Sequence, residues 1–203
     1  VLISRYYHVL GTDRGGVDVA YQSIKGVRTD VLLGTLATLI MLPIAVTLGV
    51  MAGYFKGWVD DVVQYLYTTM SSIPGILLIA ASVLLFQVYI DLHPDFFSTG
   101  MEKADARFIA LCFILGVTSW SSLCRLIRGE TLKISQLEFV QAAHAFGVSH
   151  SRIVTRHILP NVVHIILFTF VLDFSSLVLA EAVLSYIGVG IDPAMGSWGN
   201  MIN

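Results

Sequence analysis

Charge-free stretches of membrane-spanning length are the feature that most constrains this chain. Residues 31–55 and 62–90 contain no Asp, Glu, Lys or Arg, and residues 108–124 form a third such run. A fourth begins at His157 and continues to Leu172. Because crossing about 30 Å of hydrocarbon takes about 20 helical residues, and lipid offers no partner for a backbone polar group, each run predicts a transmembrane helix. The expected spans are about 31–54, 64–88, 106–125 and 160–182.

Composition agrees with a chain whose main solvent is lipid. Hydrophobic residues make up 56% of it and charged residues 13%, and the mean hydropathy is +0.78. These values predict an all-α, polytopic membrane helix bundle. Cys112 and Cys124 fall in or at the end of an apolar run, where a thiol acts as a small hydrophobe. A net charge of −2 excludes a nucleic-acid-binding surface, which needs a basic excess.

Two prolines lie inside the first two expected spans. Pro43 and Pro74 each lack a backbone donor and clash with the preceding turn, so we expect a kink at each. Membrane helices tolerate proline when neighbouring groups satisfy the freed carbonyls, and a role in gating is the second interpretation.

Charge in the connections predicts the orientation. The connection at 125–159 carries five Lys or Arg residues against two Glu residues, which favours the cytoplasm. The connection at 91–105 is acidic and should face outward. Parity then places Lys56 inside and residues 1–30 outside, as an extracytoplasmic lead-in. The chain begins at Val1 rather than at Met, so we expect a piece of a longer protein.

The basic connection has its own helical pattern. Ser135 and Glu138 have capping-box spacing, which predicts that a helix starts there. Apolar residues then recur at i, i+3, i+4 and i+7, and small side chains occupy the middle of this stripe. The stripe consists of Phe139, Ala142, Ala143 and Phe146.

The end of that helix is also marked in the sequence. Gly147 suits a left-handed closing turn, and Ser149 can cap a second helix that runs until Pro160 forces a new start. Two short helices around a glycine bend favour docking to a partner groove. The alternative is an amphipathic helix that lies in the lipid interface.

Part of this connection resembles the "EAA" loop of permease subunits of bacterial ABC importers. The family pattern is Glu-Ala-Ala, three residues, Gly, nine residues, then Ile-x-Leu-Pro. Gln141 replaces the first Glu and His157 replaces the Ile. The matching positions are Ala142, Ala143, Gly147, Leu159 and Pro160.

Three further segments are similar to the dipeptide, oligopeptide and nickel branch of that superfamily. Val17 stands where the branch usually has Arg. The segments are Leu10-Gly11-Thr12-Asp13 with Gly16-Val17-Asp18-Val19; Ala52-Gly53-Tyr54-Phe55-Lys56-Gly57-Trp58-Val59-Asp60; and Glu181-Ala182-Val183-Leu184-Ser185-Tyr186-Ile187-Gly188-Val189-Gly190 with Ser197-Trp198-Gly199.

The resemblance implies a permease subunit in a bacterial inner membrane, with four of about six spans in this chain. It implies a cytoplasmic coupling loop at 126–159, whose helix at about 138–152 docks on a separate ATP-binding subunit, and an outer re-entrant segment at 183–203. A second, homologous permease and an extracytoplasmic substrate-binding protein are the other implied partners. The implied coupling residues are Glu138, Phe139, Gln141, Ala142, Ala143, Phe146, Gly147, Leu159 and Pro160.

Two acidic residues fall inside the fourth expected span. Asp173 and Glu181 lie eight residues apart, roughly 80° around a helix, so they share a broad face. A carboxylate in lipid is costly and should face the bundle interior. Each is a candidate contact for a cationic group on the translocation path, such as a peptide N-terminus. The alternative for each is a residue that hydrogen-bonds between helices, or a protonated one.

Chemistry on the chain itself is not expected. The sequence contains no Gly-x4-Gly-Lys-Ser/Thr loop, so a partner subunit should hydrolyse ATP, and we expect no cofactor, catalytic residue or metal here. The six histidines lack the spacing of a metal site.

A secondary transporter that uses Asp173 as an ion or proton relay is the alternative function, and an intramembrane enzyme is a third. Peptides, nickel chelates and glutathione all remain candidate substrates.

Overall fold

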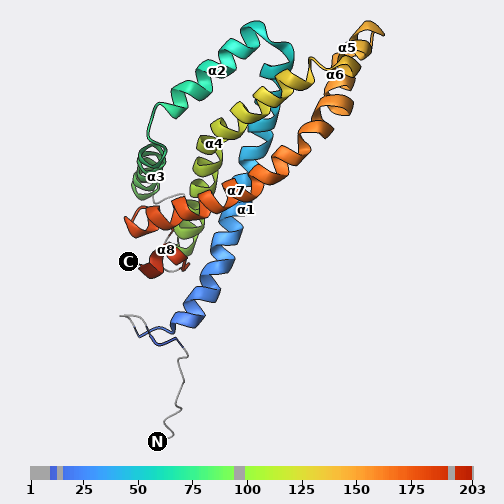
Figure 1. Ribbon diagram of the computed structural model, residues 1–203. Helices are drawn as coiled ribbons and strands as arrows, with labels where there is room; N and C mark the ends of the chain where they lie inside the picture. Colours follow the sequence, from blue (N-terminus) through green and yellow to red (C-terminus); the bar gives the residue numbers. More distant parts are fainter. Residues whose placement is uncertain (1–9, 13–15, 94–98, 192–194, 203) are drawn as a thin grey trace, which may run out of the picture.

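The structure, a computed structural model, describes residues 10–12, 16–93, 99–191 and 195–202 (Figure 1). It confirms the expected all-α architecture, and the described ranges contain no strand beyond one isolated bridge between Thr12 and Asp18. A π-helical turn, η2 (Val154–Ile158), joins α6 to α7. The helices are α1 (Val19–Phe55), α2 (Gly57–Ser71), α3 (Gly75–Leu92), α4 (Gly100–Ile134), α5 (Glu138–Ala145), α6 (His150–Ile153), α7 (Leu159–Tyr186) and α8 (Trp198–Ile202).

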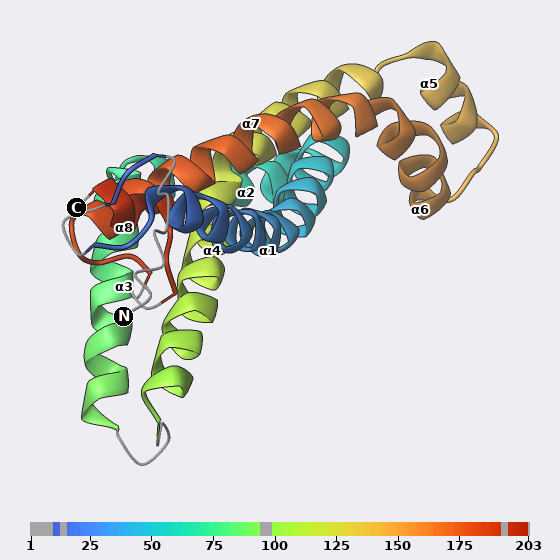
Figure 2. The ribbon, with the colours of Figure 1, turned by 90° about the horizontal axis from the view of Figure 1, so that it is seen from below.

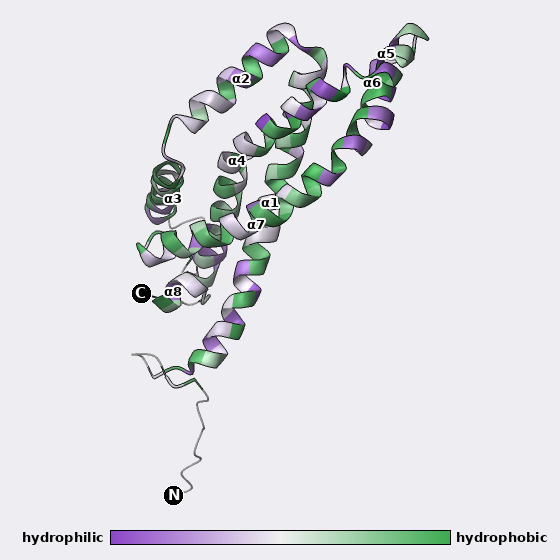
Figure 3. Ribbon diagram, in the orientation of Figure 1, coloured by the Kyte–Doolittle hydropathy of each residue, from purple (hydrophilic) through white to green (hydrophobic). Residues whose placement is uncertain are grey.

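Four helices in the described ranges are long and apolar enough to cross a membrane: Val19–Phe55, Gly75–Leu92, Gly100–Ile134 and His150–Tyr186. The first, third and fourth contain the expected spans at 31–54, 106–125 and 160–182, and continue beyond them into polar sequence. Hydrophilic residues gather around α2 and at the end of the bundle that carries α5 and α6, while α3 and much of α7 are hydrophobic (Figure 3). This distribution supports a multi-pass membrane protein.

The second span differs from the prediction of one kinked helix over 64–88. Helix α2 ends at Ser71, and α3 begins at Gly75 after Pro74. Proline cannot donate to the preceding turn and pushes the residue before it out of the helical region, so here the helix breaks rather than bends. Only α3 reaches membrane-spanning length. Pro43, in contrast, lies inside α1, which continues on both sides of it as one helix.

The predicted capping box at Ser135 is also wrong. Helix α5 does begin at Glu138, but Ser135 is the C-cap of α4 and its Oγ donates to the Leu132 carbonyl at 2.8 Å. A capping box occurs instead at the start of α4, between Thr99 and Glu102. The spacing serves there because Thr99 has the extended backbone of an N-cap, whereas Ser135 is still helical at the end of α4.

Pro160 does not force a new helix. The Leu159 amide donates to the Val154 carbonyl, five residues back, within the π turn that precedes the proline. This wider turn accommodates a residue that has no N–H and whose ring crowds the previous turn. The chain therefore runs as one stretch of helix from His150 to Tyr186.

Helices α1 and α4 form the centre of the bundle, side by side in both views (Figures 1 and 2). Glycines allow this approach: a Cβ on Gly53 would lie 2.6 Å from Thr131 Cβ, and one on Gly116 would lie 2.8 Å from the Ala37 carbonyl oxygen. Small residues at a helix interface are the usual means of close packing in membranes. In Figure 2, α3 and the first part of α4 project from this centre as a hairpin.

Candidate functional site

The connection between α4 and α7 forms a compact cap on one end of the bundle. Val140 of α5 is fully buried, and so are Ile153 and Ile158 in the helical stretch that returns to α7. These residues belong to the same apolar cluster as Leu123 and Ile127 of α4. Val140 therefore anchors one face of α5 in the apolar cluster of the bundle.

The predicted glycine bend closes α5. Gly147 has a φ of +73°, the Gly147 amide donates to the His144 carbonyl at 3.0 Å, and the Val148 amide donates to the Ala143 carbonyl at 3.0 Å. These two bonds and the left-handed residue are the Schellman arrangement of a helix C-terminus. The direction from α5 into α6 is thus fixed by the backbone.

A tyrosine at the end of α1 ties the two short helices together. The Tyr54 hydroxyl hydrogen-bonds to Nε2 of His144 at 3.1 Å and to Nδ1 of His150 at 2.8 Å. Its ring also stacks on His144, with centroids 5.8 Å apart. Two histidines with no motif in common thus meet through a residue about 90 positions earlier. The described residues contain no group of three His, Cys, Asp or Glu that could hold a metal ion.

The predicted apolar stripe of α5 splits between two faces. Phe139 and Phe146 are 44% and 87% exposed, and Ala142 is exposed beside them. Ala143, in contrast, is buried next to Val140. The outward face is therefore two phenylalanines around one alanine, and Ala143 belongs to the core. The other predicted coupling residues are exposed, except for half-buried Leu159: Glu138, Gln141, Gly147 and Pro160.

An ion pair braces α2 at the same end. Arg128 of α4 donates through Nε and a second nitrogen to the two carboxylate oxygens of Asp60, the second at 2.6 Å, and Gln64 donates to Asp60 at 3.1 Å. The hydrogen bond from Arg128 lowers the pKa of the Asp60 carboxyl below its usual value. The loop between α1 and α2 is thereby held against α4, close to α5.

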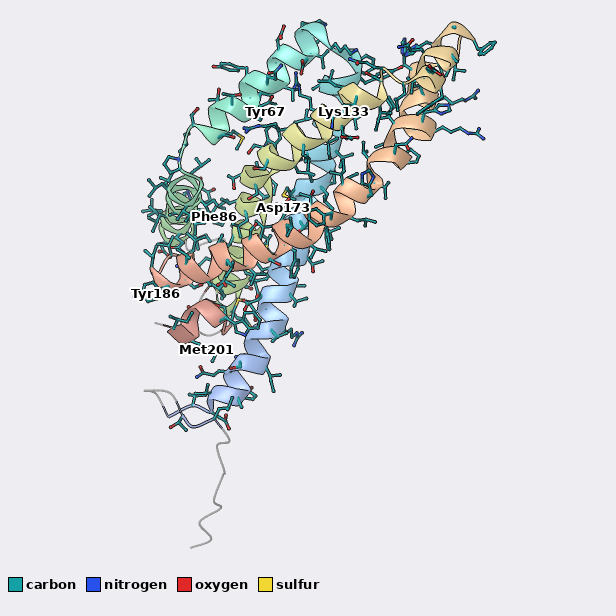
Figure 4. The ribbon with its side chains drawn as sticks, viewed as in Figure 1. Tyr67, Phe86, Lys133, Asp173, Tyr186 and Met201 are labelled. Carbon is teal, nitrogen blue, oxygen red and sulfur yellow. The ribbon has the colours of Figure 1, made fainter. Side chains whose placement is uncertain are left out.

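Asp173 lies about midway along α7, well before Tyr186 at the end of that helix (Figure 4). It lines a pocket of about 340 Å³ at the break between α2 and α3, facing α4. Its Oδ2 is buried, and no described residue hydrogen-bonds to its side chain. The hydroxyl-bearing residues that line the same pocket are Ser71, Thr118, Ser119, Ser121, Ser122 and Ser176.

Glu181 does not lie with Asp173. Eight residues separate them, about 12 Å along a helix, and Glu181 is absent from the residues that line the Asp173 pocket. Glu181 is fully buried, and Ser185 Oγ donates to its Oε1 at 2.5 Å. Its neighbour across the bundle is Asp30 of α1, also buried. The two acidic residues of α7 thus occupy different environments.

Comparison with known proteins decides the family. The sequence profile described as "Binding-protein-dependent transport system inner membrane component" matches residues 45–203. This chain belongs to that family. The predicted resemblance is therefore confirmed. The matched region of this transport-system component includes α5, the Asp60–Arg128 pair and the Asp173 pocket.

Similar members of the family are named as permeases. An oligopeptide transport system permease protein OppC from Mycobacterium bovis is 32% identical over 96% of this chain and 62% of its own length. A glutathione transport system permease protein GsiD from Pectobacterium atrosepticum is 31% identical over 97% of this chain and 59% of its own length. A dipeptide transport system permease protein DppC from Lactococcus lactis is 30% identical, over 97% and 52%. This chain thus spans about three fifths of the length of the first of these relatives.

Sequence reasoning missed three features of this binding-protein-dependent transport component. They are the Tyr54 bridge, the Asp60–Arg128 pair and the contact of Asp30 with Glu181. Asp30 stands at the edge of a charge-free run, where it reads as an ordinary end-of-span residue. The only sequence feature that points to Asp30 is its charge at the edge of an apolar run. That feature does not predict which residue it contacts.

Proposed function

We propose that this chain is a permease subunit of an ATP-driven importer of dipeptides or oligopeptides in a bacterial inner membrane. Its family, the names of its relatives and its four membrane-length helices support this function. The observation that carries the proposal is the exposed face of Phe139, Ala142 and Phe146 on a short helix that is anchored to the bundle through Val140 and Tyr54. Aromatic side chains around a small residue suit a groove in a partner protein.

The coupling mechanism follows from how α5 is attached. When a partner ATPase closes around ATP, it moves the helix docked in its cleft. Val140 and Ala143 pass that displacement to the core, and Tyr54 passes it to the end of α1. Since the Schellman turn at Gly147 fixes the bend, the cap moves as one body and shifts the balance between inward-open and outward-open states.

The translocation path includes Asp173 in this proposal. The pocket at the α2–α3 break offers one carboxylate without a partner among the described residues, together with six hydroxyl-bearing side chains. Such a site suits a positively charged amino group with further hydrogen-bonding atoms, as at the N-terminus of a peptide. A second permease subunit closes the path, and a substrate-binding protein delivers cargo to its outer end.

Co-purification tests the docking assignment. We would express the full-length protein with its ATP-binding subunits and second permease, and compare wild type with Phe146→Asp and Met101→Asp. Both side chains are highly exposed, 87% and 79%, but Met101 stands at the start of α4, far from α5. Phe146→Asp should lose the ATPase while the permease elutes as a folded peak, and Met101→Asp should keep it.

The opposite result is informative too. Retention of the ATPase by Phe146→Asp would favour an interfacial helix over a docking helix. Loss by both variants would show that the disturbance is general. Ala143→Arg is unsuitable for this test because Ala143 is buried and a charge there would damage the core.

A further inference from the structure

Asp30 of α1 and Glu181 of α7 form a buried pair of carboxyl groups. They are 1% and 0% exposed and lie within hydrogen-bonding reach of each other. Each has one oxygen engaged: the Trp198 amide donates to Asp30 Oδ2 at 3.3 Å, and Ser185 Oγ donates to Glu181 Oε1 at 2.5 Å. The other two oxygens, Asp30 Oδ1 and Glu181 Oε2, are buried and have no donor in the described structure.

No cation neutralises this pair among the described residues. The nearest charged groups on α1 are Lys25 and Arg28, which line a pocket together with Asp105 of α4, and Lys25 also lies against Gly196. Helix α8 carries no charged residue, and the other acidic residue of α7, Asp173, lies in its own pocket. Two adjacent buried carboxylates without a cation repel each other and lack solvation.

One proton resolves both problems. If one carboxyl is protonated, its O–H donates to the bare oxygen of the other, so both unsatisfied oxygens gain a partner and one negative charge disappears. We propose that Asp30 and Glu181 bind a single shared proton, and that this proton fastens residues 195–202 to α1 and α7. The site is thus a proton-binding site at the junction of three elements.

The surrounding contacts show how the pair holds residues 195–202 against α1 and α7. Trp198 reaches Asp30 through its amide, and its indole Nε1 donates to the Ser23 carbonyl at 3.1 Å. The ring fills the space above Gly26, where a Cβ would lie 2.8 Å from Trp198 Cδ1. On the other side, Ser185 Oγ accepts the Ile191 amide at 3.0 Å while it donates to Glu181.

Loss of the shared proton would leave two adjacent carboxylates, with only the Trp198 amide and the Ser185 hydroxyl as hydrogen-bond donors. The C-terminal contact should then loosen as pH rises, and should stay closed at lower pH. Ser197 is a suitable reporter because it is 1% exposed in the closed contact. The two cysteines of this sequence give little background, since Cys112 and Cys124 are 2% and 0% exposed.

The test measures labelling of Ser197→Cys in the full-length protein by a membrane-impermeant maleimide between about pH 6 and about pH 9. Rates are divided by those of Ile202→Cys, at the end of the helix that begins directly after Ser197, to remove the intrinsic pH dependence of maleimide chemistry; Ile202 is 68% exposed. The corrected rate should rise by up to about tenfold per pH unit, as for release of one proton.

Two isosteric variants are the matched comparison. Asp30→Asn and Glu181→Gln each replace the protonated acid by an amide that donates the same hydrogen bond and cannot ionise. In either background the corrected rate should stay low and flat across the pH range. An equal pH slope in parent and variants would overturn the proposal, and so would a flat parent.

If neither variant folds, a corrected parent rate that does not rise with pH still overturns the proposal. None of these measurements depends on an ATPase or a substrate. A failure here therefore leaves the proposed transport function untouched.

Discussion

Asp60 and Arg128, 68 residues apart in the sequence, join α2 to α4 through paired contacts between a guanidinium and a carboxylate. Both side chains are largely shielded, with 14% and 20% exposure. A two-point contact of this kind is stronger than a single ion pair and sets the orientation of both groups. It holds the start of α2 against α4.

Removal of this pair should destabilise the end of the bundle that carries α5. We expect Asp60→Asn to lower the free energy of unfolding by about 1.5–3 kcal/mol, the range for a hydrogen bond to a charged group. Thermal unfolding in detergent, followed by tryptophan fluorescence, measures the change. Neighbouring Asp61→Asn is the control, because Asp61 is exposed and should alter stability little.

The same pair predicts a pH dependence. Since the folded-state pKa of Asp60 lies below its unfolded value, its stabilisation is present above the unfolded pKa and is lost as pH falls through the folded one. The stability difference between wild type and Asp60→Asn should therefore shrink on acidification. A difference that grows as pH falls would contradict the assignment.

The close contact of α1 and α4 predicts an asymmetry between two glycines. Gly53→Ala places a methyl 2.6 Å from Thr131 Cβ and 2.7 Å from the Arg128 carbonyl oxygen, so overpacking should cost about 1–3 kcal/mol. Gly129→Ala, near the C-terminal end of α4, meets nothing within 4 Å and should stabilise by about 0.5–1 kcal/mol. Unfolding midpoints of the two variants provide the comparison. Equal midpoints would show that the helices do not approach each other as described.

Tyr54 offers a test of the cap. Tyr54→Phe keeps the ring but removes the hydroxyl that contacts His144 and His150, at a cost of about 0.5–1.5 kcal/mol for each hydrogen bond. Limited proteolysis in the loop at 135–149 should become faster than in wild type. Tyr65→Phe is the matched control, since Tyr65 is 71% exposed on α2. An unchanged cleavage rate in Tyr54→Phe would mean that packing alone holds the cap.

Asp173 predicts a substrate preference for a charged amino group. In proteoliposomes that contain the full transporter, Asp173→Asn should reduce uptake of peptides with a free N-terminus by roughly tenfold to a hundredfold, the equivalent of a lost charged hydrogen bond. N-acetylated peptides should be affected much less.

Two comparisons keep this test specific. Asp61→Asn, on α2, should transport like wild type. If Asp173→Asn reduces both classes of peptide equally, the residue has a structural role in the bundle rather than a role in recognition.

Sequence alone predicted an element correctly where that element is determined by residues close to one another in the chain. The charge-free runs predicted the membrane helices because a backbone in hydrocarbon must bond within its own helix. Gly147 predicted the end of α5 because few other residues adopt a left-handed φ at low cost. Pro74 and Pro160 show the limit of such rules: one breaks a helix and the other is absorbed by a π turn. The outcome depends on what packs around each proline.

The sequence by itself determined an all-α membrane bundle, the loop that holds α5 and the family to which the chain belongs. Tertiary structure alone decided that Ala143 faces inward while Phe146 faces outward, that Tyr54 meets two histidines, and that Glu181 is paired with Asp30 rather than placed beside Asp173. The physical reason is that periodicity assigns residues to a face of one helix. Which neighbouring helix that face meets, and at what height, depends on the close packing of all the helices together.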